Sequence, residues 1–120
     1  MDQGEAAVIV ERRGRVQWLT INRPHRRNAL NEAVVAGLSA GVSAAMGDPD
    51  VRAIVLTGAG EGAFCAGGDL QPGADGSPFS LSPDDPRHFV AGFFRLLETC
   101  RLPVIARVNG HALAGGLGLV

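Results

Sequence analysis

The sequence predicts an α/β fold in which neighbouring strands pair in parallel, and two kinds of segment support this class. Residues 53–57 and 104–108 are continuous apolar runs, which is typical of strands buried on both faces. Each run follows a segment, 31–47 or 88–100, in which apolar residues recur at helical spacing. Strands that alternate with helices along a chain favour parallel pairing, because each helix carries the chain back across the sheet.

The composition is that of one small folded domain. The chain has 120 residues, of which 46% are hydrophobic and 19% are charged, and this balance excludes intrinsic disorder of the whole chain. The net charge of −1 gives no overall attraction to nucleic acid or to an anionic membrane, so we expect neither as a partner. All 11 basic residues are arginine, which excludes lysine Schiff-base chemistry and a P-loop lysine.

Cysteine usage and the N-terminal residues lead us to expect a cytoplasmic location. Cys65 and Cys100 have no CxxC spacing, so we expect two free thiols rather than a disulfide. Residues 1–5 include acidic side chains and lack the apolar core of a signal peptide. The longest uncharged stretches, 33–47 and 108–120, are shorter than the roughly 20 residues of a membrane span, so we expect a soluble protein.

The first element predicted is a β-hairpin. Its strands are expected at 7–10 and 16–21, with a glycine-containing turn over 11–15. Along the second strand, Val16, Trp18 and Thr20 alternate with Gln17, Leu19 and Ile21. Residues 22–27 are expected to form a polar loop, because Pro24 and the high charge density do not suit a strand.

The next element predicted is a helix over 31–47. Asn28 or Asn31 can cap its N-terminus, and Glu32 is favourably placed in its first turn. Its apolar stripe consists of Val34, Leu38, Val42 and Ala45 or Met46. Its opposite side is small and uncharged, and consists of Ala36, Gly37, Ala40, Ser43, Ala44 and Gly47. Such a side either packs closely against a second layer or another subunit, or is an exposed alanine-rich face, and the sequence leaves both open.

Residues 48–50 end this helix, and the strand 53–57 follows. Residues 58–68, around Phe64, Cys65 and Ala66, are expected to form a glycine-rich loop. Residues 71–86 contain four prolines and are expected to form a mobile flap.

The last part of the chain is predicted to form a helix, a strand and a glycine-rich turn. The helix runs from His88 to about Cys100, and Phe89, Phe93, Leu96 and Leu97 share one of its stripes. Pro103 opens the buried strand 104–108. The final apolar run, 112–120, has no cap and no polar tail, so we expect that the chain is cut within an element.

Two glycine-rich turns are the strongest candidates for a functional site. Residues 66–69 (Ala-Gly-Gly-Asp) come after the strand 53–57, and residues 114–116 (Ala-Gly-Gly) come after the strand 104–108. Ligands of open α/β sheets bind beyond the carboxyl ends of strands, and glycine lets them approach backbone N–H groups closely. A helix beginning near Gly115 would add its N-terminal amides and dipole. Two such turns facing one atom would form an oxyanion hole; alternatively, both are tight turns and nothing more.

Other catalytic motifs are absent or weaker. The glycines at 115–118 lack the G-x-G-x-x-G spacing of a dinucleotide site, no G-x-S-x-G elbow is present, and no residues have metal-ligand spacing, so we expect no metal. Cys65 is a conceivable nucleophile, but a buried packing role is favoured. His111 is likewise interpreted as a packing or hydrogen-bonding residue rather than a base.

One loop carries a dense group of basic side chains: Arg23, His25, Arg26 and Arg27. Such a group is either a solvated surface cluster or a clamp for phosphates, since guanidinium groups bind phosphate through paired hydrogen bonds.

Three ordered motifs resemble the enoyl-CoA hydratase/isomerase (crotonase) superfamily. The first is Ile21-Asn22-Arg23-Pro24 followed by Asn28-Ala29-Leu30-Asn31. The second is Ile54-Val55-Leu56-Thr57-Gly58 followed by Ala63-Phe64-Cys65-Ala66-Gly67-Gly68-Asp69-Leu70. The third is Pro103-Val104-Ile105-Ala106, then Asn109-Gly110 and Ala114-Gly115-Gly116.

The resemblance implies a crotonase-type (ClpP/crotonase) α/β spiral of repeated ββα units. Residues 1–120 would be the N-terminal part of a single such domain, and the full-length protein would be a homotrimer or hexamer. The expected substrate is an acyl-CoA thioester, with no cofactor besides the coenzyme A of the substrate itself. The activity implied first is that of an enoyl-CoA hydratase of fatty-acid oxidation, which is a lyase.

The resemblance also implies roles for individual residues. The backbone N–H groups of Gly68 and Gly115 would form the oxyanion hole that stabilises a thioester enolate. The backbone of Ala66, Asp69 and Leu70 would hold the adenine and pantetheine parts of coenzyme A. Arg26 or Arg27 would face its phosphates, and Phe89 and Phe93 would border the acyl pocket together with residues 71–86.

Two departures from the family pattern change these expectations. Gln71 stands where many hydratases carry a lysine, so one phosphate contact is absent. Gly118 stands where hydratases carry one catalytic glutamate, and the position of the second would lie beyond Val120. This favours, as an alternative, an enoyl-CoA isomerase or another member that works with one carboxylate. A further alternative is a non-catalytic, acyl-CoA-binding subunit.

Overall fold

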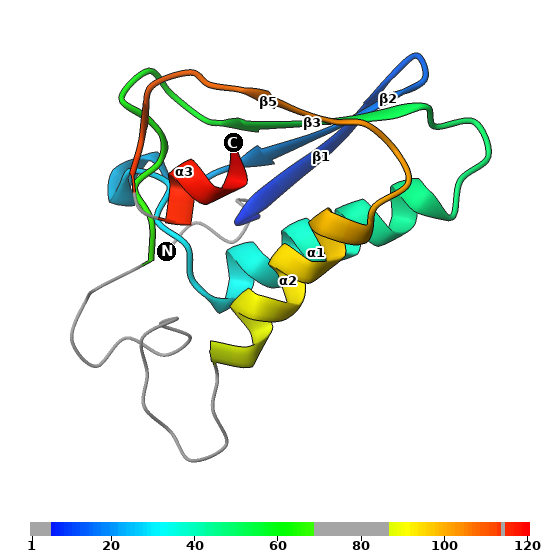
Figure 1. The fold of residues 1–120 in the computed structure, drawn as a ribbon. Helices are drawn as coiled ribbons and strands as arrows, with labels where there is room; N and C mark the ends of the chain where they lie inside the picture. Colours follow the sequence, from blue (N-terminus) through cyan, green and yellow to red (C-terminus); the bar gives the residue numbers. More distant parts are fainter. Residues whose placement is uncertain (1–5, 69–86, 114) are drawn as a thin grey trace.

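The computed structural model describes residues 6–68, 87–113 and 115–120 of the chain (Figure 1). The region expected to form a flap, 71–86, lies outside the described residues. The elements are β1 (Val8–Arg13), β2 (Val16–Ile21), the 3-10 helix η1 (Pro24–Arg26), α1 (Glu32–Met46), β3 (Ala53–Gly58), β4 (Ala63–Cys65), α2 (Arg87–Thr99), β5 (Val104–Arg107), β6 (His111–Ala112) and α3 (Gly115–Leu119).

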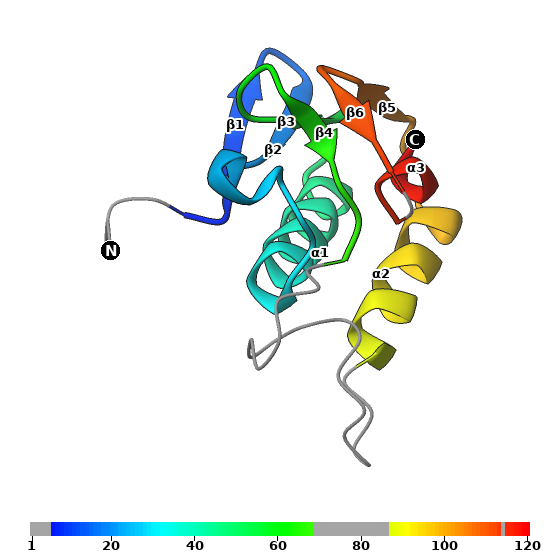
Figure 2. The ribbon, with the colours of Figure 1, turned by 90° about the vertical axis from the view of Figure 1, so that its left-hand side faces the viewer.

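A four-stranded sheet with the order β1-β2-β3-β5 forms the main layer. β1 and β2 are antiparallel, whereas β2, β3 and β5 are mutually parallel, as the alternation of strands and helices predicts. Helices α1 and α2 pack against each other and lie on the same face of the sheet (Figures 1 and 2). The predicted α/β class is therefore confirmed. None of the helices in the described residues has the length and hydrophobicity needed to cross a membrane.

The hairpin turn is shorter than the predicted span of 11–15. β1 continues to Arg13, which pairs with Val16, so that only two residues connect the strands. Gly14 adopts a φ of 62°, the left-handed value that a tight two-residue hairpin requires at its first position. The guanidinium of Arg13 also lies 4.0 Å from the ring centroid of Trp18, which adds a cation–π contact within the extended hairpin.

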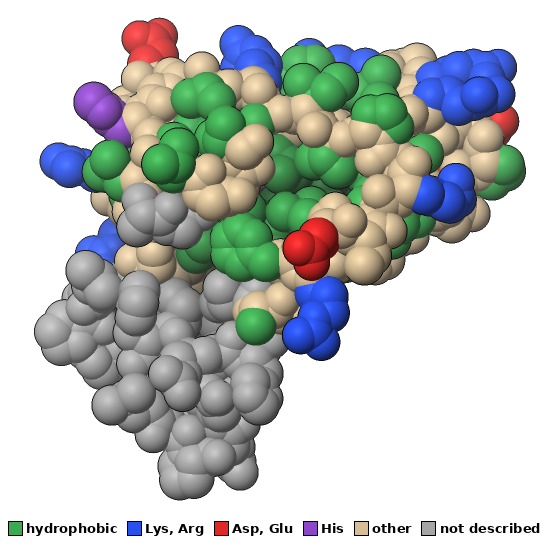
Figure 3. Space-filling model, viewed as in Figure 1, with side chains coloured by type: hydrophobic (Ala, Val, Ile, Leu, Met, Phe, Trp, Pro, Cys, Tyr) green, Lys and Arg blue, Asp and Glu red, His purple; other side chains and the backbone are tan. Residues whose placement is uncertain are grey.

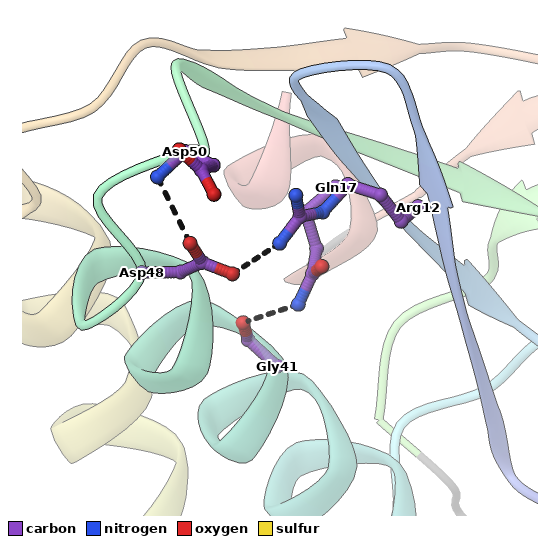
Figure 4. A network of polar contacts seen from close by, with 5 residues as sticks. All are labelled: Arg12, Gln17, Gly41, Asp48 and Asp50. Atoms are coloured by element: carbon purple, nitrogen blue, oxygen red, sulfur yellow. Dashed lines mark hydrogen bonds and ion pairs between the residues drawn. The ribbon is translucent and has the colours of Figure 1, made fainter.

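The inner face of β2 is buried against α1, as the predicted alternation requires. Gln17, Leu19 and Ile21 are buried, whereas their neighbours on the outer face are half-exposed. The contact is close because Gly41 faces the strand: an added Cβ there would lie 2.5 Å from Cδ2 of Leu19. The buried amide of Gln17 donates a hydrogen bond of 3.3 Å to the Gly41 carbonyl (Figure 4).

The small side of α1 is largely exposed in this single chain, so no second layer of the described residues covers it; packing against another subunit stays a prediction. The exposed residues are Ala36, Ala40, Ser43, Ala44 and Gly47. Gly37 differs from them, because it is half-buried and an added Cβ would lie 2.8 Å from Cγ2 of Val8.

Side-chain hydrogen bonds mark both ends of α1. Asn31, rather than Asn28, is the N-cap, because its Oδ1 accepts a hydrogen bond of 2.9 Å from the backbone N–H of Val34. Beyond the C-terminus, the Asp48 carboxylate accepts a hydrogen bond of 2.9 Å from the Asp50 backbone N–H and forms an ion pair with Arg12 (Figure 4). The Asp50 N–H, assisted by Arg12, holds the pKa of Asp48 below its usual value.

The expectation that strand 104–108 is buried on both faces is wrong. β5 pairs with β3 only, at the end of the sheet, and its residues alternate between half-buried and exposed. Ile105 is 51% exposed, and Val108, which lies after the strand, is 50% exposed. Figure 3 shows hydrophobic side chains gathered on the face that carries β5, α2 and α3. A groove of about 590 Å³ lies there, lined by residues of α2, β5 and α3 with Val120.

The expectation of a plain loop over 58–68 is also wrong, because this segment contains β4. Phe64 and Cys65 have no solvent exposure, so their backbone groups require partners within the protein. β6 provides them by pairing in parallel with β4, with Ala63 opposite His111 and an irregularity before Cys65. The remainder of the predicted apolar run 112–120 includes the short helix α3.

Two asparagine side chains hold the start of β4 in place. Asn28 is fully buried, and its Nδ2 donates to the carbonyls of Ala59 (3.1 Å) and Ala63 (2.8 Å). Asn109 also donates to Ala63 (3.0 Å) and accepts a hydrogen bond from the Gly58 N–H (3.0 Å). The segment between β3 and β4 is therefore held between residues that precede α1 and residues that follow β5.

Replacing Asn28 should destabilise the protein markedly. Asn28→Ala removes both donated hydrogen bonds and the bond of 2.8 Å that Asn28 Oδ1 accepts from the Arg23 N–H. It also places alanine at a φ of 57°, where asparagine is better tolerated. We expect the free energy of unfolding, measured by denaturant titration, to fall by about 2–4 kcal/mol.

The matched control is Asn22→Ala. The Asn22 side chain donates a single exposed hydrogen bond, to the Ala6 carbonyl, so its loss should cost about 1 kcal/mol or less. Equal losses for the two variants would show that the Asn28 amide has no special structural role.

Candidate functional site

The first glycine turn is held by the segment that precedes α1. The Ala66 N–H donates to the Arg27 carbonyl at 3.1 Å, and the Leu30 N–H donates to the Gly67 carbonyl at 2.6 Å. Leu30 and Gly68 also form a single parallel bridge. Gly67 has a φ of 99°, a value that residues with a Cβ rarely adopt. The backbone at Gly68, three residues after the end of β4, is thus held by contacts outside its own turn.

The second glycine turn packs against the end of the same strand. The Leu113 N–H donates to the Cys65 carbonyl at 3.0 Å, and α3 begins two residues later at Gly115. Gly116 lies so close to β4 that an added Cβ would be 2.0 Å from the Cys65 carbonyl oxygen. The structure therefore places described residues of both turns next to Cys65: residues 66–68 follow it along the chain, and Gly116 packs against its carbonyl.

Cys65 itself is a packing residue by its environment. It has no solvent exposure, and burial raises the pKa of its thiol, an effect that the Gly67 backbone N–H opposes only in part. A buried, protonated thiol is a poor nucleophile, so its surroundings favour the packing role. Among the described residues, no three His, Cys, Asp or Glu side chains gather as a metal site would need.

Arg27 and His111 line a common cleft beside the first turn. The cleft has a volume of about 390 Å³, and its other lining residues are Gly62, Ala63, Ala66 and Leu113. Arg27 is exposed, whereas Arg26 is half-buried and does not line this cleft. The sequence left Arg26 and Arg27 equivalent; the fold distinguishes them.

Three other predicted site residues fall at or beyond the limits of what the structure describes. Asp69 and Leu70 lie outside the described residues. Phe89 belongs to α2, but its side chain is also outside the described part.

Phe93, the second aromatic residue predicted to border the acyl pocket, lies in the core. It is 2% exposed, and its ring centroid lies 6.1 Å from that of Phe94. Phe94 lines the groove of about 590 Å³ between α2 and α3, as does Gly118. An added Cβ at Gly118 would lie 3.3 Å from Cε1 of Phe94, so the position faces this ring.

Sequence reasoning overlooked three residues of this region. Asn28 was considered as a helix cap and Asn109 as part of a turn, whereas both bind the Ala63 carbonyl. The interpretation of His111 as a packing or hydrogen-bonding residue rather than a base does not place it in a cleft, whereas the structure shows that it is exposed and lines the cleft with Arg27. Of these three residues only Asn109 has a local sequence signal, because the Asn-Gly pair at 109–110 favours turns. The side-chain partners are distant in sequence and leave no local pattern.

The relatives found by comparison with known proteins agree on one family. The sequence profile of the enoyl-CoA hydratase/isomerase family matches residues 11–120. The probable enoyl-CoA hydratase EchA14 of Mycobacterium tuberculosis is 45% identical over 105 residues, which are 87% of this chain and 40% of that protein. The short-chain-enoyl-CoA hydratase of Clostridium acetobutylicum is 40% identical over 112 residues, which are 91% of this chain and 41% of that protein.

Solved structures show the same relationship. An enoyl-CoA hydratase from Bacillus anthracis superposes with a TM-score of 0.80 at 32% identity, covering 94% of this chain and 43% of that one. A carnitinyl-CoA dehydratase from Mycobacterium avium gives a TM-score of 0.78 at 45% identity, covering 96% and 42%. The chain thus spans about two-fifths of the length of its relatives. It belongs to the enoyl-CoA hydratase/isomerase family and has the N-terminal part of the crotonase fold.

Proposed function

We propose that this chain contributes the oxyanion hole and part of the coenzyme A site of an acyl-CoA enzyme of the enoyl-CoA hydratase type. The observation that carries the proposal is the meeting of two glycine turns at the end of β4, where one turn follows Cys65 along the chain and the other packs against the Cys65 carbonyl. The names of the relatives support the reaction class, because those compared above by sequence are enoyl-CoA hydratases.

The chemistry proposed for the turns is stabilisation of negative charge. When a thioester enolate forms, charge grows on the carbonyl oxygen, and preorganised N–H donors stabilise it more strongly than the neutral carbonyl. We assign these donors to Gly68 and Gly115. Gly115 suits the role because it begins α3, and the first amides of a helix have no partner within the helix.

We assign the coenzyme A portion of the substrate to the neighbouring backbone and cleft. Ala66, followed by Asp69 and Leu70, would contact the adenine and pantetheine parts. Arg27 is the better candidate for a phosphate contact than Arg26, because it is exposed and lines the cleft that also contains Ala66. We propose no cofactor beyond the coenzyme A of the substrate. The homotrimeric or hexameric assembly and the cytoplasmic location also remain proposals.

Gly118 favours a second candidate function, enoyl-CoA isomerisation. Hydration needs a water activated on one side and a proton delivered to the α-carbon, tasks usually shared by two carboxylates. Gly118 provides no carboxylate and faces the ring of Phe94. A proton shuttle within an unsaturated acyl chain needs only one base, so it should tolerate this glycine better.

Side-by-side assays of crotonyl-CoA hydration and 3-enoyl-CoA isomerisation test this distinction in the protein at its natural length. We expect hydration to be slow, and Gly118→Glu to raise it by roughly 10- to 100-fold by restoring one general acid–base group. An added Cβ at Gly118 needs the Phe94 ring to shift by only a few tenths of an ångström, and Gly118 itself is exposed. Gly92→Glu is the matched control, because it adds the same charge at an exposed position of α2 with open space around it.

Each alternative predicts a different result. Full hydratase speed in the unmodified protein would show that Gly118 does not limit hydration. Acyl-CoA binding without either reaction would identify a non-catalytic binding subunit. Failure to bind any acyl-CoA would contradict the proposed function altogether.

Gly116→Ala should strongly slow whichever reaction the protein catalyses. Its Cβ would lie 2.0 Å from the Cys65 carbonyl oxygen, so α3 must move away from β4 and carry Gly115 with it. A displacement of about 1 Å can cost on the order of 100-fold in rate, so we expect at least that loss in kcat/KM.

The control for this variant is Gly92→Ala in α2, where an added Cβ meets nothing within 4 Å. It should retain activity and increase stability by about 0.5–1 kcal/mol, since alanine favours a helix over glycine. Full activity of Gly116→Ala would refute the proposed importance of the contact between α3 and β4.

A further inference from the structure

The side chain of Asn109 joins two segments that are distant from it in sequence, the end of β3 and the start of β4. Its Oδ1 accepts a hydrogen bond of 3.0 Å from the Gly58 N–H. Its Nδ2 donates to the carbonyls of Gly60 (2.9 Å) and Ala63 (3.0 Å), so the oxygen and the nitrogen of the amide are both engaged. An amide bound in three directions keeps one orientation. Asn109 therefore fixes the position of Ala63 relative to the backbone that follows β5.

The strands that lead to the two glycine turns begin beside this amide. Ala63 is the first residue of β4, and His111, two residues after Asn109, is the first residue of β6. The two strands lie side by side, with Ala63 opposite His111 (Figure 2). From this pair, β4 leads to the first glycine turn, and β6 leads to the second turn at the start of α3.

The ladder between β4 and β6 is too short to set the register of the two strands by itself. β6 consists of His111 and Ala112, and the pairing is irregular between Ala63 and Cys65. Register is well specified where a regular pattern of buried side chains and a defined turn fix it, and a strand of two residues offers little of either. The Asn109 amide supplies this constraint, because it holds the Ala63 carbonyl beside the start of β6.

The register matters because the two turns must present their donors to one atom. An oxyanion hole requires both N–H groups to lie about 2.7–3.1 Å from the position that the charged oxygen takes. A slip of one residue between the strands would displace one turn relative to the other by about 3.3 Å. A displacement of about 1 Å already costs on the order of 100-fold in rate.

We propose that Asn109 is a positioning residue of the oxyanion hole: its amide holds the starts of β4 and β6 together and so sets the distance between the two backbone donors. The proposal rests on the proposed function, which assigns those donors to Gly68 and Gly115. Asn28 binds the same carbonyl of Ala63 from the segment before α1. Of the two asparagines, Asn109 is the one whose own segment continues into the second turn.

The test compares Asn109→Asp and Asn109→Ala with the unmodified protein, all at the natural length. Aspartate keeps the size of the side chain and the acceptor for the Gly58 N–H, but it removes the donor to the carbonyls of Gly60 and Ala63. The substrate is crotonyl-CoA or 3-enoyl-CoA, whichever the unmodified protein converts. We expect kcat to fall by about 10- to 100-fold and KM to change by less than about 3-fold, since the lost stabilisation belongs to the transition state.

Acetoacetyl-CoA provides a readout that a merely structural role would not move. This thioester ionises to an enolate whose ultraviolet absorbance differs from that of the ketone, and an oxyanion hole lowers the pKa of the bound ligand by stabilising the enolate. In both variants we expect this pKa to rise by about 1 to 2, which corresponds to a roughly 10- to 100-fold weaker stabilisation. The affinity for coenzyme A itself should stay the same, because coenzyme A has no thioester carbonyl.

Gln17→Ala is the matched control for the loss of an amide that bonds to backbone. The Gln17 side chain donates to the Gly41 carbonyl, in the contact between β2 and α1 rather than at β4 or β6. This variant should have a lower thermal stability, because a buried carbonyl loses its donor. Its kcat and the pKa of bound acetoacetyl-CoA should be those of the unmodified protein.

The outcomes separate this proposal from the function on which it rests. An unchanged pKa of bound acetoacetyl-CoA in a folded Asn109 variant would overturn the positioning role and leave the oxyanion hole in place. Unfolding of both variants would also overturn that role, because Asn109 would then act on stability alone. If the unmodified protein does not lower this pKa, or binds no acyl-CoA, the proposed function itself is contradicted.

Discussion

The carbonyl of Ala63 is the point on which the arrangement of the candidate site depends. It accepts hydrogen bonds from the side-chain amides of Asn28 (2.8 Å) and Asn109 (3.0 Å), which lie in the segments that follow the parallel strands β2 and β5. These bonds place the start of β4, and the strand then carries the chain to Cys65, where both glycine turns pack. A buried carbonyl with two amide donors is expensive to leave unsatisfied, so the segment has one favourable position.

The site that results is built from backbone rather than from charged side chains. Gly110 and Gly116 let segments approach β4 more closely than any larger residue would, since an added Cβ would lie 2.7 Å from the Ala63 nitrogen and 2.0 Å from the Cys65 oxygen, respectively. Backbone donors held in this way need no reorganisation when charge develops beside them. The ion pairs of Arg12 with Asp48 and of Arg13 with Glu11 lie at the surface, where such pairs contribute little to stability.

Errors of sequence interpretation occurred where a residue's environment depends on distant segments. The strand at 104–108 has the continuous apolar composition of a doubly buried strand, yet Ile105 is half-exposed because alternate residues of β5, at the end of the sheet, lie on a face that the described residues leave uncovered. Residues 63–65 lack the length of a recognisable strand, and they become β4 only because His111 and Ala112 lie opposite. In both cases the local pattern is compatible with several environments, and strand neighbours decide among them.

The sequence by itself determined the α/β class, the helix over 32–46, the inner face of β2 and the family, because periodicity, turn residues and ordered motifs are local properties. Only the tertiary structure decided that Asn31 caps α1 while Asn28 holds β4, that Arg27 rather than Arg26 lines the cleft, and that His111 joins it there. Asn28, Arg27 and His111 take these roles through segments roughly 30 to 80 residues away along the chain, and contacts across such separations exist only after the strands have paired. Because Asn28 belongs to that distant network, the local cap, a bond from the Val34 N–H, is left to Asn31.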